Sequence, residues 1–327
     1  MLMSKIKSIL IVTAITISIL FVFEICARFY IDFERGNSNV GVSERNQNLN
    51  YQAFTMWGKN LDSESKVFNN QIVTENTFKI LLLGASTAEA FNSDILESDF
   101  SRFINRPVKV FNAASGGFNI RQEAIALSLV AESVKPDLIL VLDGANDIIH
   151  ATRPGTILGT TYVDRTYRLM LQKPWFSPFV YLLQNSQLFN GVLSKTKRNT
   201  YDSAMIDSRV ADATAVYLQT RDFINLYSKG ANIPIVFMLQ PFVGFSRTDN
   251  DAAARNLYKY RENGVLKGFE LISNTDTNGL CFLDSNREIE DKKLDLHFSD
   301  DVHFKDLIGY HFLSTFFLTA YKSCFIK

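Results

Sequence analysis

The chain of 327 residues has few cysteines and histidines and no excess of either charge. It contains three cysteines and four histidines, and no Cys-x-x-Cys or His-x-x-x-His spacing occurs, which argues against a zinc site. Its 34 basic residues equal its 34 acidic residues, whereas a nucleic-acid surface needs a strong positive excess. We therefore expect no metal ion, no cofactor and no nucleic-acid partner.

The few cysteines leave one pair outside the N-terminal region. Cys26 lies in an apolar N-terminal stretch, so Cys281 and Cys324 remain. An oxidising compartment would allow these two thiols to join, and the sequence predicts a disulfide between them. The alternative is that both are small buried apolar residues.

The one long apolar run lies at the N-terminus. Lys5 and Lys7 precede residues 8–23, which are apolar apart from four serines and threonines. Extended to residue 30, the run reaches the length of about 20 residues that a bilayer requires, and no clean cleavage site follows. We expect residues 1–30 to be an uncleaved signal anchor, a transmembrane helix that leaves the remaining chain on the extracytoplasmic side. The alternative is a cleaved signal and a secreted protein; a buried helix fits less well, because the run is apolar on all sides.

The rest of the chain is divided by composition. Residues 31–76 are rich in Asn, Ser and Gln and are predicted to be a juxtamembrane stalk, and residues 77–327 a single domain of about 250 residues. Within it, the aromatic-rich segment 151–203 forms either a lid over a site or an insertion packed onto the domain. The part of the domain after residue 203 is predicted to alternate helix and strand, which favours a parallel sheet. The expected elements are a helix at 204–229, a strand at 233–239, a helix at 251–272, a strand at 280–284 and a helix at 310–321.

Ser86 follows an apolar run that stops abruptly at Gly84. Such a run is typical of a buried parallel strand, and open parallel sheets bind ligands at the carboxyl ends of their strands. A serine at that place can act as a nucleophile. The alternative is that Ser86 caps a helix, because Glu89 stands three residues on, as in a capping box.

Two further strand ends carry residues suited to bind an anionic oxygen. The run that begins at Val108 ends in the paired glycines Gly116 and Gly117, whose backbone N–H groups can face a ligand. The run from Leu138 ends at Gly144, Asn146 and Asp147, where the Asn146 amide can donate to an oxyanion. Ordinary turns explain either segment taken alone.

Asp300 and His303, near the C-terminus, stand three residues apart. A turn would let the carboxylate orient the imidazole, and a serine nucleophile needs such a base. Of the other histidines, His150 could contact a substrate, His297 could give a supporting hydrogen bond, and His311 falls within the final helix.

These four segments together resemble the SGNH hydrolase family, also called the GDSL esterase and lipase family, over about three quarters of the chain. The resemblance implies a three-layer α/β/α sandwich with a central parallel sheet, as in flavodoxin-like folds. It implies Ser86 as nucleophile, His303 as general base and Asp300 as the residue that orients the imidazole. The implied oxyanion hole consists of the N–H groups of Ser86 and Gly117 and the side chain of Asn146.

The chain departs from the family pattern at two positions. Ala85 replaces an aspartate and Ala114 stands where glycine is common. Neither residue carries a proton in the reaction, so the departures leave the catalytic prediction in place. Gly116 is the rival of Gly117 for the oxyanion hole, and the family spacing favours Gly117.

These predictions combine into a membrane-anchored serine esterase on the extracytoplasmic side. Its substrate would be a carboxylic ester, for example an O-acyl group on a cell-envelope glycan. An O-acyltransferase would use the same acyl-serine, with a sugar hydroxyl in place of water as the acceptor. A third reading is a non-catalytic glycan-binding protein on the same fold.

Overall fold

The computed structural model describes residues 18, 22, 50–52, 56–58, 73–152, 203–243, 252–275, 279–287, 297–299 and 302–326. The chain forms two compact units, one of residues 1–47 and 165–200 and one of residues 48–164 and 201–327. Ser18 and Val22, both helical, are the described residues of the first unit. No helix among the described residues is long and apolar enough to cross a membrane. Apart from Ser18 and Val22, the predicted anchor lies outside the described residues, as do most of the predicted stalk and nearly all of segment 151–203.

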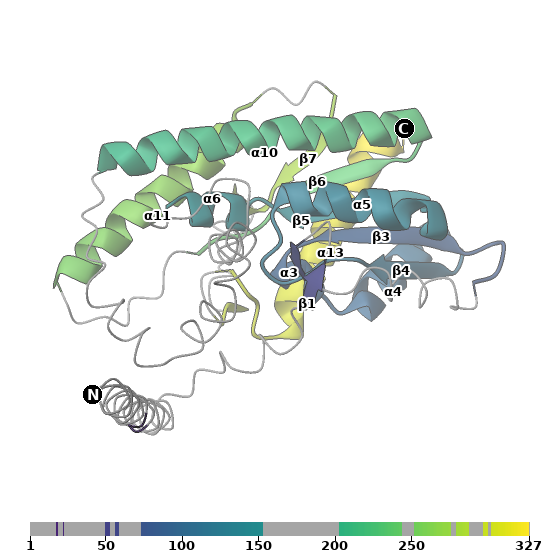
Figure 1. Cartoon of the computed structure of the whole chain (residues 1–327). Coiled ribbons are helices and arrows are strands. Elements are labelled where there is room, and N and C mark those ends of the chain that lie inside the picture. Colours follow the sequence, from purple (N-terminus) through teal and green to yellow (C-terminus); the bar gives the residue numbers. More distant parts are fainter. Residues whose placement is uncertain are drawn as a thin grey trace, which may run out of the picture. The chain divides into compact units, whose positions relative to one another are not determined.

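The second unit is built on a five-stranded parallel sheet with the strand order β4-β3-β5-β6-β7 (Figure 1). The strands are β3 (Phe78–Gly84), β4 (Val108–Asn112), β5 (Leu138–Asp143), β6 (Ile235–Leu239) and β7 (Cys281–Asp284). The apolar runs of the sequence therefore form buried parallel strands, as predicted. Because β3 lies between β4 and β5, the carboxyl ends of these three strands are neighbours at one edge of the sheet.

Helices cover both faces of this sheet. Successive side chains of a strand point to opposite faces. Leu81 and Leu83 of β3 pack in one apolar core with α5 (Ile120–Val134), α10 (Ser203–Ala231) and α11 (Ala252–Ser273). Ile80 and Leu82 pack in a second core with α4 (Ser93–Ile104) and α13 (Leu307–Phe325). The predicted α/β/α layering is confirmed for this unit.

Two short antiparallel strands, β1 (Asn50–Gln52) and β2 (Met56–Gly58), pair within the segment that was predicted to be a stalk. Three-residue strands give no periodicity that a sequence pattern could reveal. The helices and strands expected after residue 203 are present, and none of their ends differs from the expectation by more than four residues.

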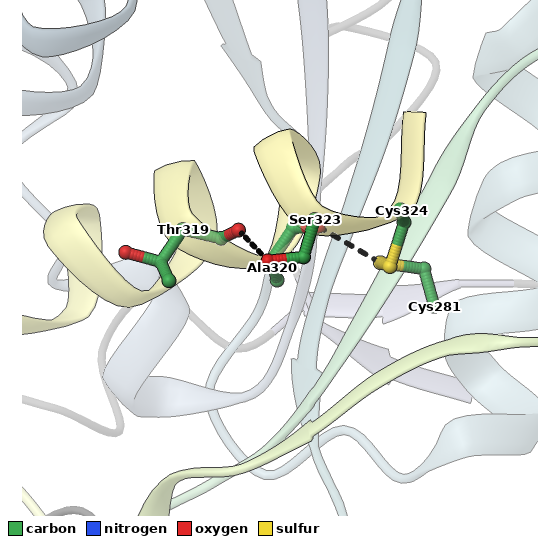
Figure 2. The surroundings of a disulfide bond; sticks show 5 residues. All are labelled: Cys281, Thr319, Ala320, Ser323 and Cys324. Carbon is green, nitrogen blue, oxygen red and sulfur yellow. Dashed lines mark hydrogen bonds between the residues drawn. A yellow bond between two sulfur atoms is a disulfide. The ribbon is translucent and has the colours of Figure 1, made fainter. Parts of the chain in front are cut away.

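A disulfide joins the edge strand β7 to the last helix. Cys281 begins β7, Cys324 lies in the last turn of α13, and their Cα atoms are 5.8 Å apart (Figure 2). The predicted pairing of these two cysteines is confirmed. The bond closes a loop between positions 43 residues apart, and this loop contains His303.

Candidate active site

A sharp turn delivers Ser86 to the carboxyl end of the central strand. β3 ends at Gly84, and the short helix α3 (Ser86–Glu89) begins two residues later. A side chain at Gly84 would place its Cβ 2.4 Å from the carbonyl oxygen of Leu142 and 2.5 Å from Cβ of Ala88. Position 84 therefore has room for glycine alone, which explains why the apolar run stops there.

The Ser86 hydroxyl lies against an imidazole rather than capping a helix. Ser86 Oγ and His303 Nε2 are 2.6 Å apart. Ala85 occupies the N-cap position, and the Glu89 carboxylate accepts the backbone N–H of Gly116 at 2.9 Å. The capping-box alternative is therefore wrong, because both of its side chains bind other parts of the chain.

His303 reaches Ser86 from a loop 217 residues further along the chain. The loop is closed by an isolated antiparallel bridge between Phe298 and Phe304, whose rings pack with centroids 4.2 Å apart and planes tilted by 41°. The Ser299 N–H donates to the His303 carbonyl. The proposed orienting residue, Asp300, lies outside the described residues, so its role stays a prediction.

The other three histidines lie elsewhere. His297 Nδ1 is 2.8 Å from Asp306 Oδ2, and this hydrogen bond lowers the pKa of the Asp306 carboxyl. Asp306 also caps α13, since its Oδ1 accepts the Gly309 N–H. His150 is buried and His311 is exposed on α13. His303 is therefore the histidine that meets the serine.

The two glycines after β4 have different roles. The Gly116 N–H is occupied by Glu89, and a Cβ added at Gly116 would lie 3.9 Å from Cβ of Ser86, so this turn runs beside Ser86. Gly117 has a φ of +82°, and within the described part of the chain its N–H has no acceptor. Of the two N–H groups, that of Gly117 remains to bind a substrate oxygen.

Asn146 lies at the start of α6 (Ala145–Ala151), directly after β5. Its Nδ2 donates one hydrogen bond to the Phe118 carbonyl at 2.8 Å. An amide nitrogen has two hydrogens, so one remains for a ligand. The Asp147 carboxylate accepts the Ile120 N–H at 3.2 Å and fixes the start of α5 to α6. The loops after β4 and β5 are thus joined beside the Ser86 turn.

A buried cluster of ionisable residues, which the sequence did not indicate, surrounds Asp143 at the end of β5. Tyr217 donates to Asp143 Oδ1 at 2.8 Å, and Glu123 and Arg221 are buried within the same cluster. Burial raises the pKa of Asp143 to about 7, against the opposing effects of the Tyr217 hydrogen bond and the Arg221 charge. Burial, and then the negative charge of Asp143, raises the pKa of Glu123 well above its usual value. Both shifts favour the protonated, uncharged forms of these carboxyl groups.

No group of three or more His, Cys, Asp or Glu side chains suited to hold a metal ion occurs among the described residues.

Comparisons with known proteins give likeness in fold at low identity. No protein-family model matches the chain, and no curated protein matches it. Among solved structures, the acetyl xylan esterase AlAXEase is similar, with 14% identity, a TM-score of 0.40, and 74% of this chain and 99% of that chain covered. The acetylxylan esterase Axe2 from Geobacillus stearothermophilus has 16% identity, a TM-score of 0.39, and coverages of 76% and 95%. A lipase/acylhydrolase from Enterococcus faecalis has 13% identity, a TM-score of 0.37, and coverages of 75% and 96%.

Proposed function

We propose that this protein is a serine esterase in which Ser86 is the nucleophile and His303 the general base. The observation that carries the proposal is the 2.6 Å contact between Ser86 Oγ and His303 Nε2 at the carboxyl end of the central strand. A hydroxyl is a weak nucleophile unless a neighbour accepts its proton, and an imidazole nitrogen in hydrogen-bond contact is the usual acceptor.

In the proposed reaction, the Ser86 proton moves to His303 Nε2 while Oγ bonds to the ester carbonyl carbon. The bond to the leaving alcohol then breaks, and His303 returns the proton to that alcohol. Water next gives a proton to His303 and attacks the acyl carbon, and the Oγ–carbon bond breaks with the proton returning to Ser86. Asp300 is proposed to hold the imidazole in the tautomer that this exchange needs.

Negative charge develops on one oxygen during both attacks. We propose the backbone N–H groups of Ser86 and Gly117 and the free hydrogen of the Asn146 amide as its hydrogen-bond donors. The open N–H of Gly117 and the second N–H of Asn146 support this assignment. A single donor of this kind contributes about 3 kcal/mol to stabilising the transition state.

We further propose that the catalytic unit is held on the extracytoplasmic side of a membrane by residues 1–30 and acts on O-acyl groups of a cell-envelope glycan. The apolar N-terminal run after Lys5 and Lys7 supports the anchor. The Cys281–Cys324 disulfide is in keeping with an oxidising compartment. Fractionation of cells after alkaline extraction and protease shaving tests both points, and a protein that resists shaving in intact spheroplasts would contradict the orientation.

The test of the enzymatic proposal is labelling of the full chain, purified in mild detergent, with a fluorophosphonate probe that reacts with activated serines. The variants are Ser86→Ala and His303→Ala. Their matched controls are Ser128→Ala and His311→Ala, which change an exposed serine on α5 and an exposed histidine on α13. Hydrolysis of p-nitrophenyl acetate without an added acceptor is measured in parallel.

We expect labelling and ester turnover in the wild type and in both controls, and neither in the two site variants. No labelling of folded wild-type protein would refute the serine-enzyme proposal. Labelling with turnover that requires an added sugar would favour acyl transfer over hydrolysis.

A further inference from the structure

A second hydrogen bond runs parallel to the contact between Ser86 and His303. Thr87, the residue after Ser86, donates its hydroxyl to the carbonyl of Val302, the residue before His303, at 3.0 Å. Gln240, the first residue beyond β6, contacts the same hydroxyl through Nε2 at 2.6 Å. Thr87 is fully buried and Gln240 is 1% exposed, so water does not compete for these bonds.

The direction of each bond follows from the chemistry of its groups. The Val302 carbonyl can only accept, so Thr87 donates its single hydroxyl hydrogen to it. The Thr87 oxygen can then act toward Gln240 only as an acceptor, which requires Gln240 to present its NH₂ group. The two hydrogen bonds therefore point the same way: Gln240 donates to Thr87, and Thr87 donates to Val302.

Gln240 is itself held firmly by the sheet. Its backbone N–H donates to the Asp143 carbonyl at 2.7 Å, which continues the pairing of β6 with β5. Asn286, after β7, donates to the Gln240 carbonyl at 3.4 Å. The hydrogen bonds thus connect the carboxyl end of β6 to the loop that carries His303.

The bond to Val302 differs from the bond to Ser86 in one important respect. In the proposed reaction the Ser86 proton leaves at each turnover, and an acylated Ser86 has no hydroxyl hydrogen to share with His303. The Thr87 hydrogen takes no part in the reaction. It can therefore hold the loop while the contact between the serine and the histidine is broken.

We infer that Thr87 and Gln240 are positioning residues that fix the His303 loop on the helix that carries the nucleophile. The inference rests on the proposed function and adds to it a second attachment point for the general base. A base misplaced by about 1 Å can lose as much as 100-fold in rate, which is the effect expected when the attachment is removed.

The test compares Thr87→Val, Thr87→Ser, Gln240→Met and Gln240→Glu in the full chain. Valine keeps the shape of threonine without the hydroxyl, and serine keeps the hydroxyl. Methionine removes the donor to Thr87 but leaves Thr87 free to donate to Val302. A glutamate carboxylate would instead accept the Thr87 hydrogen and draw it away from Val302.

The readouts are the limiting rate constant of fluorophosphonate labelling and the probe concentration at half-saturation. For Thr87→Val and Gln240→Glu we expect the limiting rate to fall by about 10- to 100-fold with half-saturation unchanged. Thr87→Ser should label within about threefold of the wild type, and Gln240→Met should lie between these groups. Equal limiting rates for wild type and Thr87→Val would overturn the inference.

Hydrogen–deuterium exchange of peptides containing residues 302–306 gives a second readout that does not depend on activity. Thr87→Val should speed exchange there, and Thr87→Ser should not. If wild-type protein fails to label, the proposed function fails, and hydrogen–deuterium exchange alone tests whether Thr87 holds the His303 loop. Unchanged exchange in Thr87→Val would then overturn the inference. If Thr87→Val does not fold, the comparison of Gln240→Glu with Gln240→Met decides in its place.

Discussion

Removal of the disulfide should destabilise the catalytic unit by an amount set by the loop that it closes. Cys281 and Cys324 are 43 positions apart. Closing a loop of this length removes enough conformational entropy from the unfolded chain to stabilise the fold by about 4 kcal/mol at 25 °C. In a unit of this size, each 1 kcal/mol shifts the melting temperature by about 2–4 °C. The variant Cys324→Ser should therefore melt about 8–16 °C below the wild type.

Cys324→Ser is preferable to a change at Cys281, because Cys324 is exposed whereas Cys281 is buried. The assay is thermal unfolding by circular dichroism, with and without reductant, and Cys26→Ser serves as the control that removes a cysteine outside the pair. Reductant should lower the melting temperature of the wild type and of the control, but not that of Cys324→Ser. A shift of less than about 1 kcal/mol on removing Cys324 would refute the reasoning, since the loop length alone predicts several times more.

Three other predictions concern Asn146, the turn at Gly84 and the buried carboxyl groups of Glu123 and Asp143. Asn146→Ala should lower p-nitrophenyl acetate turnover about 100-fold or more with folding intact, because one oxyanion donor is lost; turnover within about threefold of the wild type would exclude that role. Gly84→Ala should destabilise the fold, because the added Cβ meets the Leu142 carbonyl at 2.4 Å, and an unchanged melting temperature would contradict that packing. Burial raises the pKa of Asp143 to about 7, so the stability that this group contributes is full below about pH 4 and is lost as the pH rises through about 7. The pKa of Glu123 is also raised, so its contribution is likewise lost as the pH rises. Glu123→Gln, whose amide cannot ionise, should show a shallower fall in melting temperature from about pH 5 to about pH 9, and parallel curves would argue against ionisation of Glu123 as the cause.

The central sheet could be predicted from the sequence because its strands are buried on both faces. Such strands read as short apolar runs, and the run that ends at Gly84 stops where no side chain fits. Small and polar residues directly after three of the strands then suggested a site at one edge. The order of the strands brings those three ends together, which a local pattern cannot show by itself.

The partners within the site could not be predicted from local sequence, because they come from distant parts of the chain. Glu89 resembled half of a capping box, yet its carboxylate binds Gly116, 27 residues away. Tyr217 and Asp143 are 74 residues apart, and Gln240 and Thr87 are 153 apart. The one local sign of Gln240 was its place at the end of a predicted strand, and that sign is common to many residues with no such role.

The geometry of the last helix separates stability from the chemistry of the site. His303 lies four residues before α13 begins, and Cys324 lies in its last turn. A helix of 19 residues is about 28 Å long, so the disulfide and the imidazole lie near opposite ends of the same rod. Two of the hydrogen bonds that hold the His303 loop, from Thr87 to Val302 and from Ser299 to His303, lie near the N-terminal end of α13. Cys324→Ser should therefore melt earlier but label with a fluorophosphonate at the wild-type rate well below its transition, whereas Thr87→Val should label slowly while the disulfide is intact.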